Sequence, residues 1–193
     1  MIAWVFAALH PELLDALVIV NAPHPAIFGK LLAGDPAQQL ASAYMLMLRS
    51  PIAEATLRAS SFAWLTSTVL EGGIKAGTIT EADRQAYIDA WSQPGALTGG
   101  LNYYRAARIG PGQGGAAASI ATTATAGAPL IVRVPTLVIW GEQDPALITR
   151  NLDGLDALVP NLTVRRIADG THWVVREQPV LVNQLIREFL AQR

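Results

Sequence analysis

TLVIW at residues 136–140, followed directly by GEQDP at residues 141–145, is the stretch that decides the predicted fold. The first five residues form an apolar run rich in β-branched side chains, which is typical of a strand buried on both faces of a parallel sheet. The next five residues favour a turn, so the strand ends there. We therefore predict a buried parallel strand whose carboxyl end carries an acidic loop.

Two further strands flank this one in the sequence, at Leu17–Val20 and Leu162–Ile167. Helical patterns alternate with the three strands, at residues 1–10, 146–158 and 179–192. Strands that alternate with helices predict an α/β fold, with a parallel sheet and right-handed crossovers. A sheet of three strands is small, and we expect one of its edges to be open.

A long helical insertion separates the first strand from the second. Its predicted helices cover residues 38–49, 52–70, 81–91 and 97–108. Residues 110–128 are rich in Gly, Ala, Ser and Thr, which predicts a mobile loop. We therefore divide the chain into a core at residues 1–34 and 109–193 and an insertion at residues 35–108.

Composition excludes several classes of function. The 193 residues are 51% hydrophobic and 15% charged, with a net charge of -1 and no basic stripe, so nucleic-acid binding is not expected. The absence of cysteine excludes disulfides, thiolate metal sites and a cysteine nucleophile. No apolar run reaches the roughly 20 residues of a membrane span, and no secretory leader is recognisable, so we expect a cytoplasmic protein.

An acid and a histidine follow two neighbouring strands. Asp144 comes just after the strand at residues 136–140, and His172 comes just after Leu162–Ile167. Loops at the carboxyl ends of adjacent parallel strands meet, so Asp144 is expected to orient His172 as a general base. Glu142 is the competing acid, and we expect it to point away. The alternative is that Asp144 is a turn residue and His172 an ordinary loop histidine.

A hydrolase of this kind needs a nucleophile, usually on a Gly-x-nucleophile-x-Gly turn before the acid and the histidine. No Gly-x-Ser-x-Gly or Gly-x-Asp-x-Gly motif occurs in the sequence. The first helix opens directly on apolar residues after Met1, without a capping side chain. We therefore expect the chain to start inside a fold and to lack the nucleophile segment.

Several motifs together resemble the epoxide hydrolases and haloacetate dehalogenases of the α/β-hydrolase superfamily. They are HPE at residues 10–12, LVIVNAPHP at residues 17–25, WGEQDP at residues 140–145 and GTHW at residues 170–173. The resemblance implies a partial α/β-hydrolase fold, consisting of its last three parallel strands with flanking helices. It also implies that residues 35–108 are the helical cap domain.

The resemblance further implies that two cap tyrosines hold and protonate an epoxide oxygen. Tyr104, in LNYYR at residues 101–105, takes the place of one, and Tyr44 takes the place of the other. A phenol suits this role because opening an epoxide creates an alkoxide that needs a proton. The alternative is that both tyrosines only pack. Trp173 and His24 are candidate pocket residues, although each could equally serve packing or loop geometry.

The sequence thus predicts hydrolysis of a small epoxide to a diol through a covalent ester in a full-length parent, without metal or cofactor. Haloacid or haloalkane dehalogenation is the alternative within the same fold. A third hypothesis is that the chain is a truncated fragment without catalytic activity, because no nucleophile is found in it. We expect residues 1–193 alone to be inactive, and the sequence does not predict an oligomeric state.

Overall fold

The computed structural model describes residues 1–107, 109–112 and 128–192. Its sheet contains three parallel strands in the order β1-β2-β3, formed by Leu17–Val20, Thr136–Gly141 and Leu162–Ile167. In the register, Val18 pairs with Leu137, and Val138 pairs with Val164. The predicted strands and their parallel arrangement are confirmed, and β2 extends one residue further, to Gly141.

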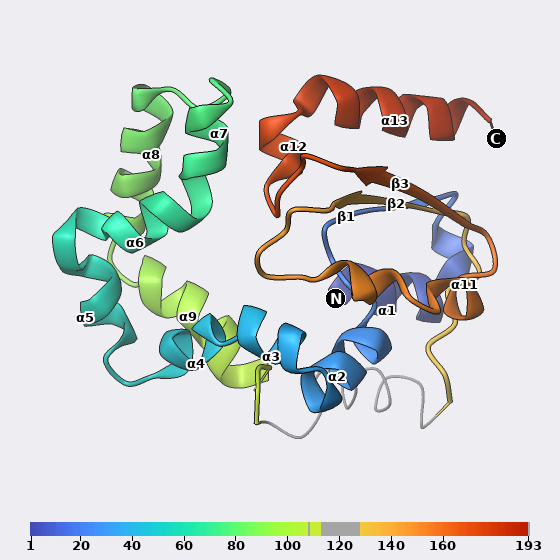
Figure 1. Cartoon of the computed structure of the whole chain (residues 1–193), viewed down its shortest axis with the longest axis horizontal. Helices are drawn as coiled ribbons and strands as arrows, with labels where there is room; N and C mark the ends of the chain where they lie inside the picture. The colour runs from blue at the N-terminus through green and yellow to red at the C-terminus, as the bar shows by residue number, and fades with distance from the viewer. Residues whose placement is uncertain (108, 113–127, 193) are drawn as a thin grey trace.

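Helices cover both faces of the sheet (Figure 1), and β2 is therefore buried along its whole length. Val138 and Trp140 point into a core shared with α1, α2 and α11, which span Ile2–Leu9, Pro25–Gly34 and Leu155–Leu158. Leu137 and Ile139 pack on the opposite face, against α12 and α13, which span Val174–Glu177 and Pro179–Ala191. This alternation follows from the period of two along a strand.

The insertion lies beside the carboxyl ends of the strands and has a hydrophobic core of its own (Figure 1). That core contains Leu48, Leu57, Phe62, Leu97 and Leu101. The α-helices of the insertion are α3 Pro36–Ala41, α4 Tyr44–Arg49, α5 Ala53–Arg58, α6 Ala63–Leu65, α7 Glu71–Lys75, α8 Glu81–Ser92 and α9 Ala96–Ala107. Shorter 3-10 and π-helical turns occupy Ala59–Phe62 and Thr66–Leu70.

Two of the predicted helices are broken in the structure. The helix predicted at residues 38–49 is interrupted after Ala41, where Ser42 separates α3 from α4. The helix predicted at residues 52–70 is interrupted at Ser60, Ser61 and Phe62, which all have positive φ. Hydrophobic periodicity does not reveal these interruptions, because the apolar side chains on both sides of each break still pack into the same core.

The prediction of one helix over residues 146–158 is wrong. Only the 3-10 turn Thr149–Leu152 and the short helix α11 form there. Ile148 has an extended backbone, with φ −66° and ψ 153°, so a helical run cannot continue through it. The Ala146 carbonyl and the Ile148 amide, which a continuous helix would use internally, bond to the side chain of Gln38 instead, at 2.8 and 3.2 Å.

Residues 23–25 lead directly from the end of β1 into a helix. There α2 begins at Pro25, and His24 caps it by accepting a hydrogen bond from Ala26 N. The mobile loop predicted at residues 110–128 and the end of the helix predicted to residue 108 lie largely outside the described residues. Within the described part of the chain, no helix has the length and apolarity required to cross a membrane.

Gly141 is the last residue of β2, and the backbone of the loop that carries His172 lies directly against it. A Cβ atom at this position would lie 2.5 Å from the carbonyl oxygens of both Gly170 and Thr171. Those two atoms belong to the backbone, so no side-chain rotation could relieve the overlap. A glycine here therefore lets the two loops come together.

We expect Gly141→Ala to lower the free energy of unfolding by about 1–3 kcal/mol, because the backbone of the His172 loop must move. Gly99→Ala is the matched control, since Gly99 lies within α9 and a Cβ there would meet nothing within 4 Å. That change should be neutral or stabilising, by up to about 1 kcal/mol. Urea unfolding of both variants measures the difference, and equal stabilities would contradict the steric argument.

Candidate active site

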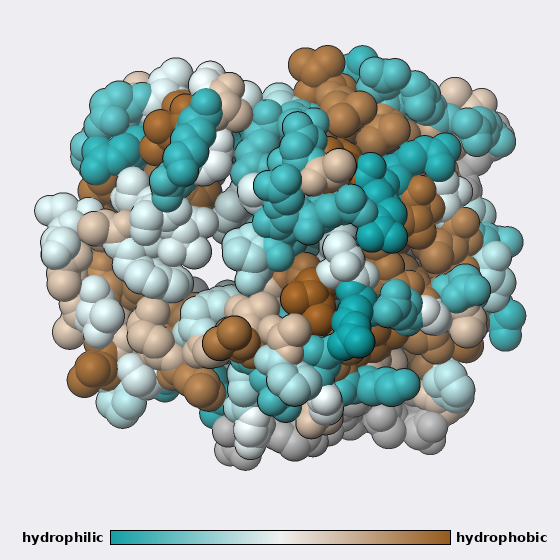
Figure 2. Space-filling model, in the orientation of Figure 1, coloured by the Kyte–Doolittle hydropathy of each residue, from teal (hydrophilic) through white to brown (hydrophobic). Residues whose placement is uncertain are grey.

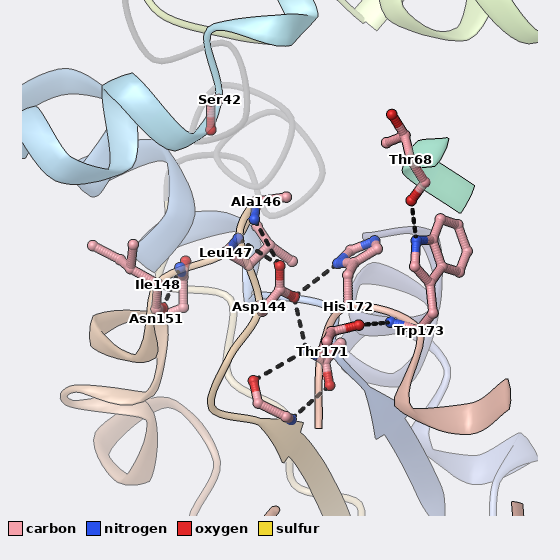
Figure 3. A network of polar contacts seen from close by, with 12 residues as sticks. Ser42, Thr68, Asp144, Ala146, Leu147, Ile148, Asn151, Thr171, His172 and Trp173 are labelled. Atoms are coloured by element: carbon pink, nitrogen blue, oxygen red, sulfur yellow. Dashed lines mark hydrogen bonds and ion pairs between the residues drawn. The ribbon is translucent and has the colours of Figure 1, made fainter. Parts of the chain in front are cut away.

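Asp144 and His172 meet at the carboxyl edge of the sheet, in the loops that follow β2 and β3 (Figure 3). His172 Nδ1 lies 2.8 Å from Asp144 Oδ2. The Asp144 side chain is fully buried, whereas the His172 side chain is 31% exposed. The pair therefore has the geometry in which a carboxylate fixes the imidazole tautomer and leaves the second ring nitrogen available as a base.

The carboxylate of Asp144 is held by four donors. Oδ1 accepts from the amides of Ala146 and Leu147, and Oδ2 accepts from His172 and from Asn21 Nδ2, which lies 2.7 Å away. These hydrogen bonds replace the water that burial removes from the carboxylate and fix its orientation. The alternative that Asp144 is only a turn residue does not account for its contact with His172.

Asn21 is a site residue to which the sequence analysis gave no role. Asn21 directly follows β1. Its φ of 41° is a left-handed conformation that asparagine adopts more readily than most residues. Its Oδ1 accepts from Gly141 N at 2.8 Å, while its Nδ2 donates to Asp144. Its place at the carboxyl end of a predicted strand was the signal that could have identified it.

Glu142 does not compete for His172. Its carboxylate pairs with the Arg166 guanidinium on β3, as expected for an acid that points away from the histidine.

A cavity of about 430 Å³ lies between the insertion and the loops that carry Asp144 and His172. The space-filling view also shows an opening between the insertion and the core on this face (Figure 2). The lining is mostly apolar, with polar groups from Tyr44, Thr68, Tyr104 and His172. The other lining residues are Ala41, Leu48, Leu57, Trp64, Leu65, Val69, Trp91, Ala96, Leu97, Gly100, Leu101, Pro145, Ala146 and Trp173.

Tyr44 and Tyr104 reach this cavity from α4 and α9 and lie against each other. Their ring centroids are 6.4 Å apart at an interplanar angle of 77°. Burial raises the pKa of the Tyr44 phenol, and the neighbouring Tyr104 adds to the shift. Burial also raises the pKa of Tyr104. Both phenols therefore stay protonated near neutral pH and can donate a hydrogen bond or a proton into the cavity.

Trp173 lines the same cavity and connects the His172 loop to the insertion. Its indole Nε1 donates to the carbonyl oxygen of Thr68 at 2.8 Å (Figure 3). Its ring meets the His172 imidazole edge to face, with centroids 5.0 Å apart. Trp173 thus limits where the imidazole can move.

His24 is not among the residues that line the cavity, in contrast to its proposed place there. It is fully buried, and its ring packs edge-on against Trp4. Its Nε2 contacts the carbonyl oxygen of Leu130 at 3.0 Å, and its Nδ1 accepts from Ala26 N. Both ring nitrogens are used by the backbone, so His24 serves the packing of the core.

Comparison with known proteins agrees with this geometry. Residues 1–179 match the family described as alpha/beta hydrolase fold. The chain belongs to this family. Among curated relatives, the α/β-hydrolase resembles the AB hydrolase superfamily protein YfhM of Bacillus subtilis (33% identity over 98% of this chain and 62% of that protein). It also resembles epoxide hydrolase 4 of Mus musculus (32% identity over 100% of this chain and 51% of that protein).

Solved structures also include epoxide hydrolases that resemble this chain. The α/β-hydrolase superposes on the Bacillus megaterium epoxide hydrolase bound to an inhibitor with a TM-score of 0.83 and 30% identity. The match covers 98% of this chain and 65% of that one. The predicted α/β-hydrolase fold and the resemblance to epoxide hydrolases are therefore confirmed. The chain spans between about half and two thirds of the length of these relatives.

The buried His24 predicts how stability depends on pH. Burial lowers its pKa from 6.5 to about 4, against the opposing effect of the hydrogen bond to Leu130. Between these two values the unfolded chain binds a proton that the folded chain excludes, so the free energy of unfolding falls as the pH is lowered. The loss should reach up to about 3 kcal/mol at pH 4.

Urea unfolding at several pH values between 4 and 7 tests this expectation. His24→Gln keeps a donor and an acceptor at the site and should flatten the pH dependence. His10→Gln is the matched control, because the His10 side chain is 50% exposed. A dependence that persists in His24→Gln would assign the titration to other groups.

Proposed function

We propose that the chain supplies the base, its orienting acid and two proton donors for epoxide hydrolysis to a diol. One observation carries the proposal: the Tyr44 and Tyr104 phenols and the His172 imidazole line the same apolar cavity. Opening an epoxide needs a proton donor for the departing oxygen, and hydrolysis of the ester that follows needs a base to activate water. The similarity to epoxide hydrolases supports this assignment.

In the first proposed step, a carboxylate attacks one epoxide carbon, and the carbon–oxygen bond breaks as a phenol donates its proton to the departing oxygen. In the second, His172 removes a proton from water, which attacks the ester carbonyl. Release of the diol regenerates the carboxylate, and the proton that His172 took from water passes to the phenolate, which restores both groups. Asp144 stabilises the imidazolium that forms in between. We assign no nucleophile, because residues 1–193 contain no Gly-x-Asp-x-Gly or Gly-x-Ser-x-Gly turn.

The insertion at residues 35–108 acts as a cap in this proposal. Its α4 and α9 bring the two phenols over the loops of the core. The apolar lining from Trp64, Trp91 and Leu97 favours a small, uncharged organic substrate.

Dehalogenation of a haloacid is the competing reaction. A haloacid carries a carboxylate, which proteins bind most readily with Arg or Lys. The described residues that line the cavity include neither Arg nor Lys, while they include two phenols. This difference favours an epoxide over a haloacid.

The test joins residues 1–193 to the portion of the Bacillus megaterium epoxide hydrolase that the match leaves uncovered, and measures diol release from styrene oxide. We expect Tyr44→Phe and Tyr104→Phe each to lower kcat by about 100-fold, because general acid catalysis is lost. Tyr103→Phe is the matched control, since Tyr103 is 56% exposed and does not line the cavity. We expect His172→Gln to accumulate the covalent ester, detectable by mass spectrometry.

Three results would change the assignment. Halide release from chloroacetate without diol formation would favour the dehalogenase. Turnover of neither substrate by the folded fusion would favour a non-catalytic role. Residues 1–193 tested alone should give no His172-dependent diol, and substantial turnover would show that a nucleophile within the chain has been overlooked.

A further inference from the structure

Gln38 lies on α3 of the insertion, is fully buried, and uses every hydrogen-bonding position of its side-chain amide. Its Nε2 donates to Ser42 Oγ at 2.9 Å and to the Ala146 carbonyl oxygen at 2.8 Å. Its Oε1 accepts from Ile148 N at 3.2 Å and from Asn151 Nδ2 at 2.7 Å. The Gln38 side chain therefore links its own part of the insertion, through Ser42, to the loop that follows β2.

The contacts on the loop lie immediately beside the groups that hold Asp144. Ala146 N and Leu147 N donate to Asp144 Oδ1 (Figure 3). Gln38 binds the carbonyl of Ala146 and the amide of Ile148. Ala146 O and Leu147 N belong to one peptide group, so the contact with Gln38 fixes the direction of the Leu147 amide. That amide in turn helps to orient the carboxylate that contacts His172.

The contact on the insertion lies beside Tyr44. Ser42 is fully buried, and it occupies the break between α3 and α4, where Met45 N donates to Ser42 O. Tyr44 is the first residue of α4. The Gln38–Ser42 hydrogen bond therefore joins the start of the Tyr44 helix to the same amide that holds the Asp144 loop.

An ion pair strengthens this junction from its exposed side. Asp35 caps α3 by accepting from Ala37 N and Gln38 N, at 2.9 and 3.1 Å. Its other carboxylate oxygen pairs with the Arg150 guanidinium, which belongs to the 3-10 turn after the Asp144 loop. The backbone around Gln38 is therefore fixed to the same loop that its side chain contacts.

We propose that Gln38 is a positioning residue for the reaction proposed above, acting from the insertion on the Asp144–His172 pair and on Tyr44. A neutral amide suits this place because it supplies two donors and two acceptors at once. Glutamate would offer acceptors only when ionised, and methionine would leave the carbonyl of Ala146 and the amide of Ile148 without their partner. The role rests on the proposed function, whereas the positioning itself can be measured without turnover.

The test measures the tautomer of His172 by long-range proton–nitrogen NMR at a pH where the ring is neutral. The chain has only three histidines, so His10→Gln and His24→Gln assign the spectrum. In the wild-type chain, the contact with Asp144 should favour the Nδ1–H form. In Gln38→Glu and Gln38→Met, we expect the ratio of Nδ1–H to Nε2–H to fall about tenfold, because Asp144 loses its fixed orientation.

Gln39→Met is the matched control on the same helix, because the Gln39 side chain donates hydrogen bonds only to the carbonyls of Leu32 and Ala33 among the described residues. It should leave the ratio unchanged. With labelled tyrosine, the Tyr44 ring resonance should move in the Gln38 variants and not in this control. Gln38→Glu has nearly the native shape, so it remains informative if Gln38→Met does not fold.

A Gln38→Glu chain that is less stable but keeps the wild-type tautomer ratio and Tyr44 resonance would overturn the proposal, because Gln38 would then serve stability alone. A lowered ratio together with absent diol formation in the fusion would support the positioning role and contradict the proposed function. The two proposals can therefore fail separately.

Discussion

The buried carboxylate of Asp144 is the constraint on which much of the site depends. A charge removed from water is tolerated only where hydrogen bonds replace its hydration. Its four donors come from the end of β1, from its own loop and from the loop after β3. The carboxylate therefore requires all three strands to end at the same edge, in the register that the sheet has.

The close approach of the two loops follows from the same arrangement. Gly141 has no side chain, and the carbonyls of Gly170 and Thr171 occupy the space that a Cβ would fill. The amide of Gln143 donates to the Gly170 carbonyl at 2.9 Å, which holds the loops together beyond the end of the sheet. This backbone contact places His172 within hydrogen-bonding distance of Asp144 without distorting either strand.

The insertion completes the site and is itself fixed by the core. It brings two phenols and most of the apolar lining to the carboxyl edge of the sheet, where the core supplies Asp144, His172 and Trp173. Gln38 connects the insertion to the Asp144 loop, and the Trp173–Thr68 hydrogen bond connects it to the His172 loop. Each of the two loops thus has its own attachment to the insertion, which limits how far the cavity can change shape.

The sequence by itself determined the three strands and their parallel arrangement, because apolar runs and turn residues are local signals. The expectation that Asp144, His172, Tyr44, Tyr104 and Trp173 form one site rested on chain order and on the family motifs, and the structure brings these side chains together. Only the tertiary structure decided the roles of Asn21, Gln38 and His24. Each of these side chains bonds to backbone or side-chain groups about a hundred residues away, and no local pattern encodes such a partner. The helix predicted over residues 146–158 fails for the same reason, since the Ala146 carbonyl and the Ile148 amide bond to Gln38, more than a hundred residues away.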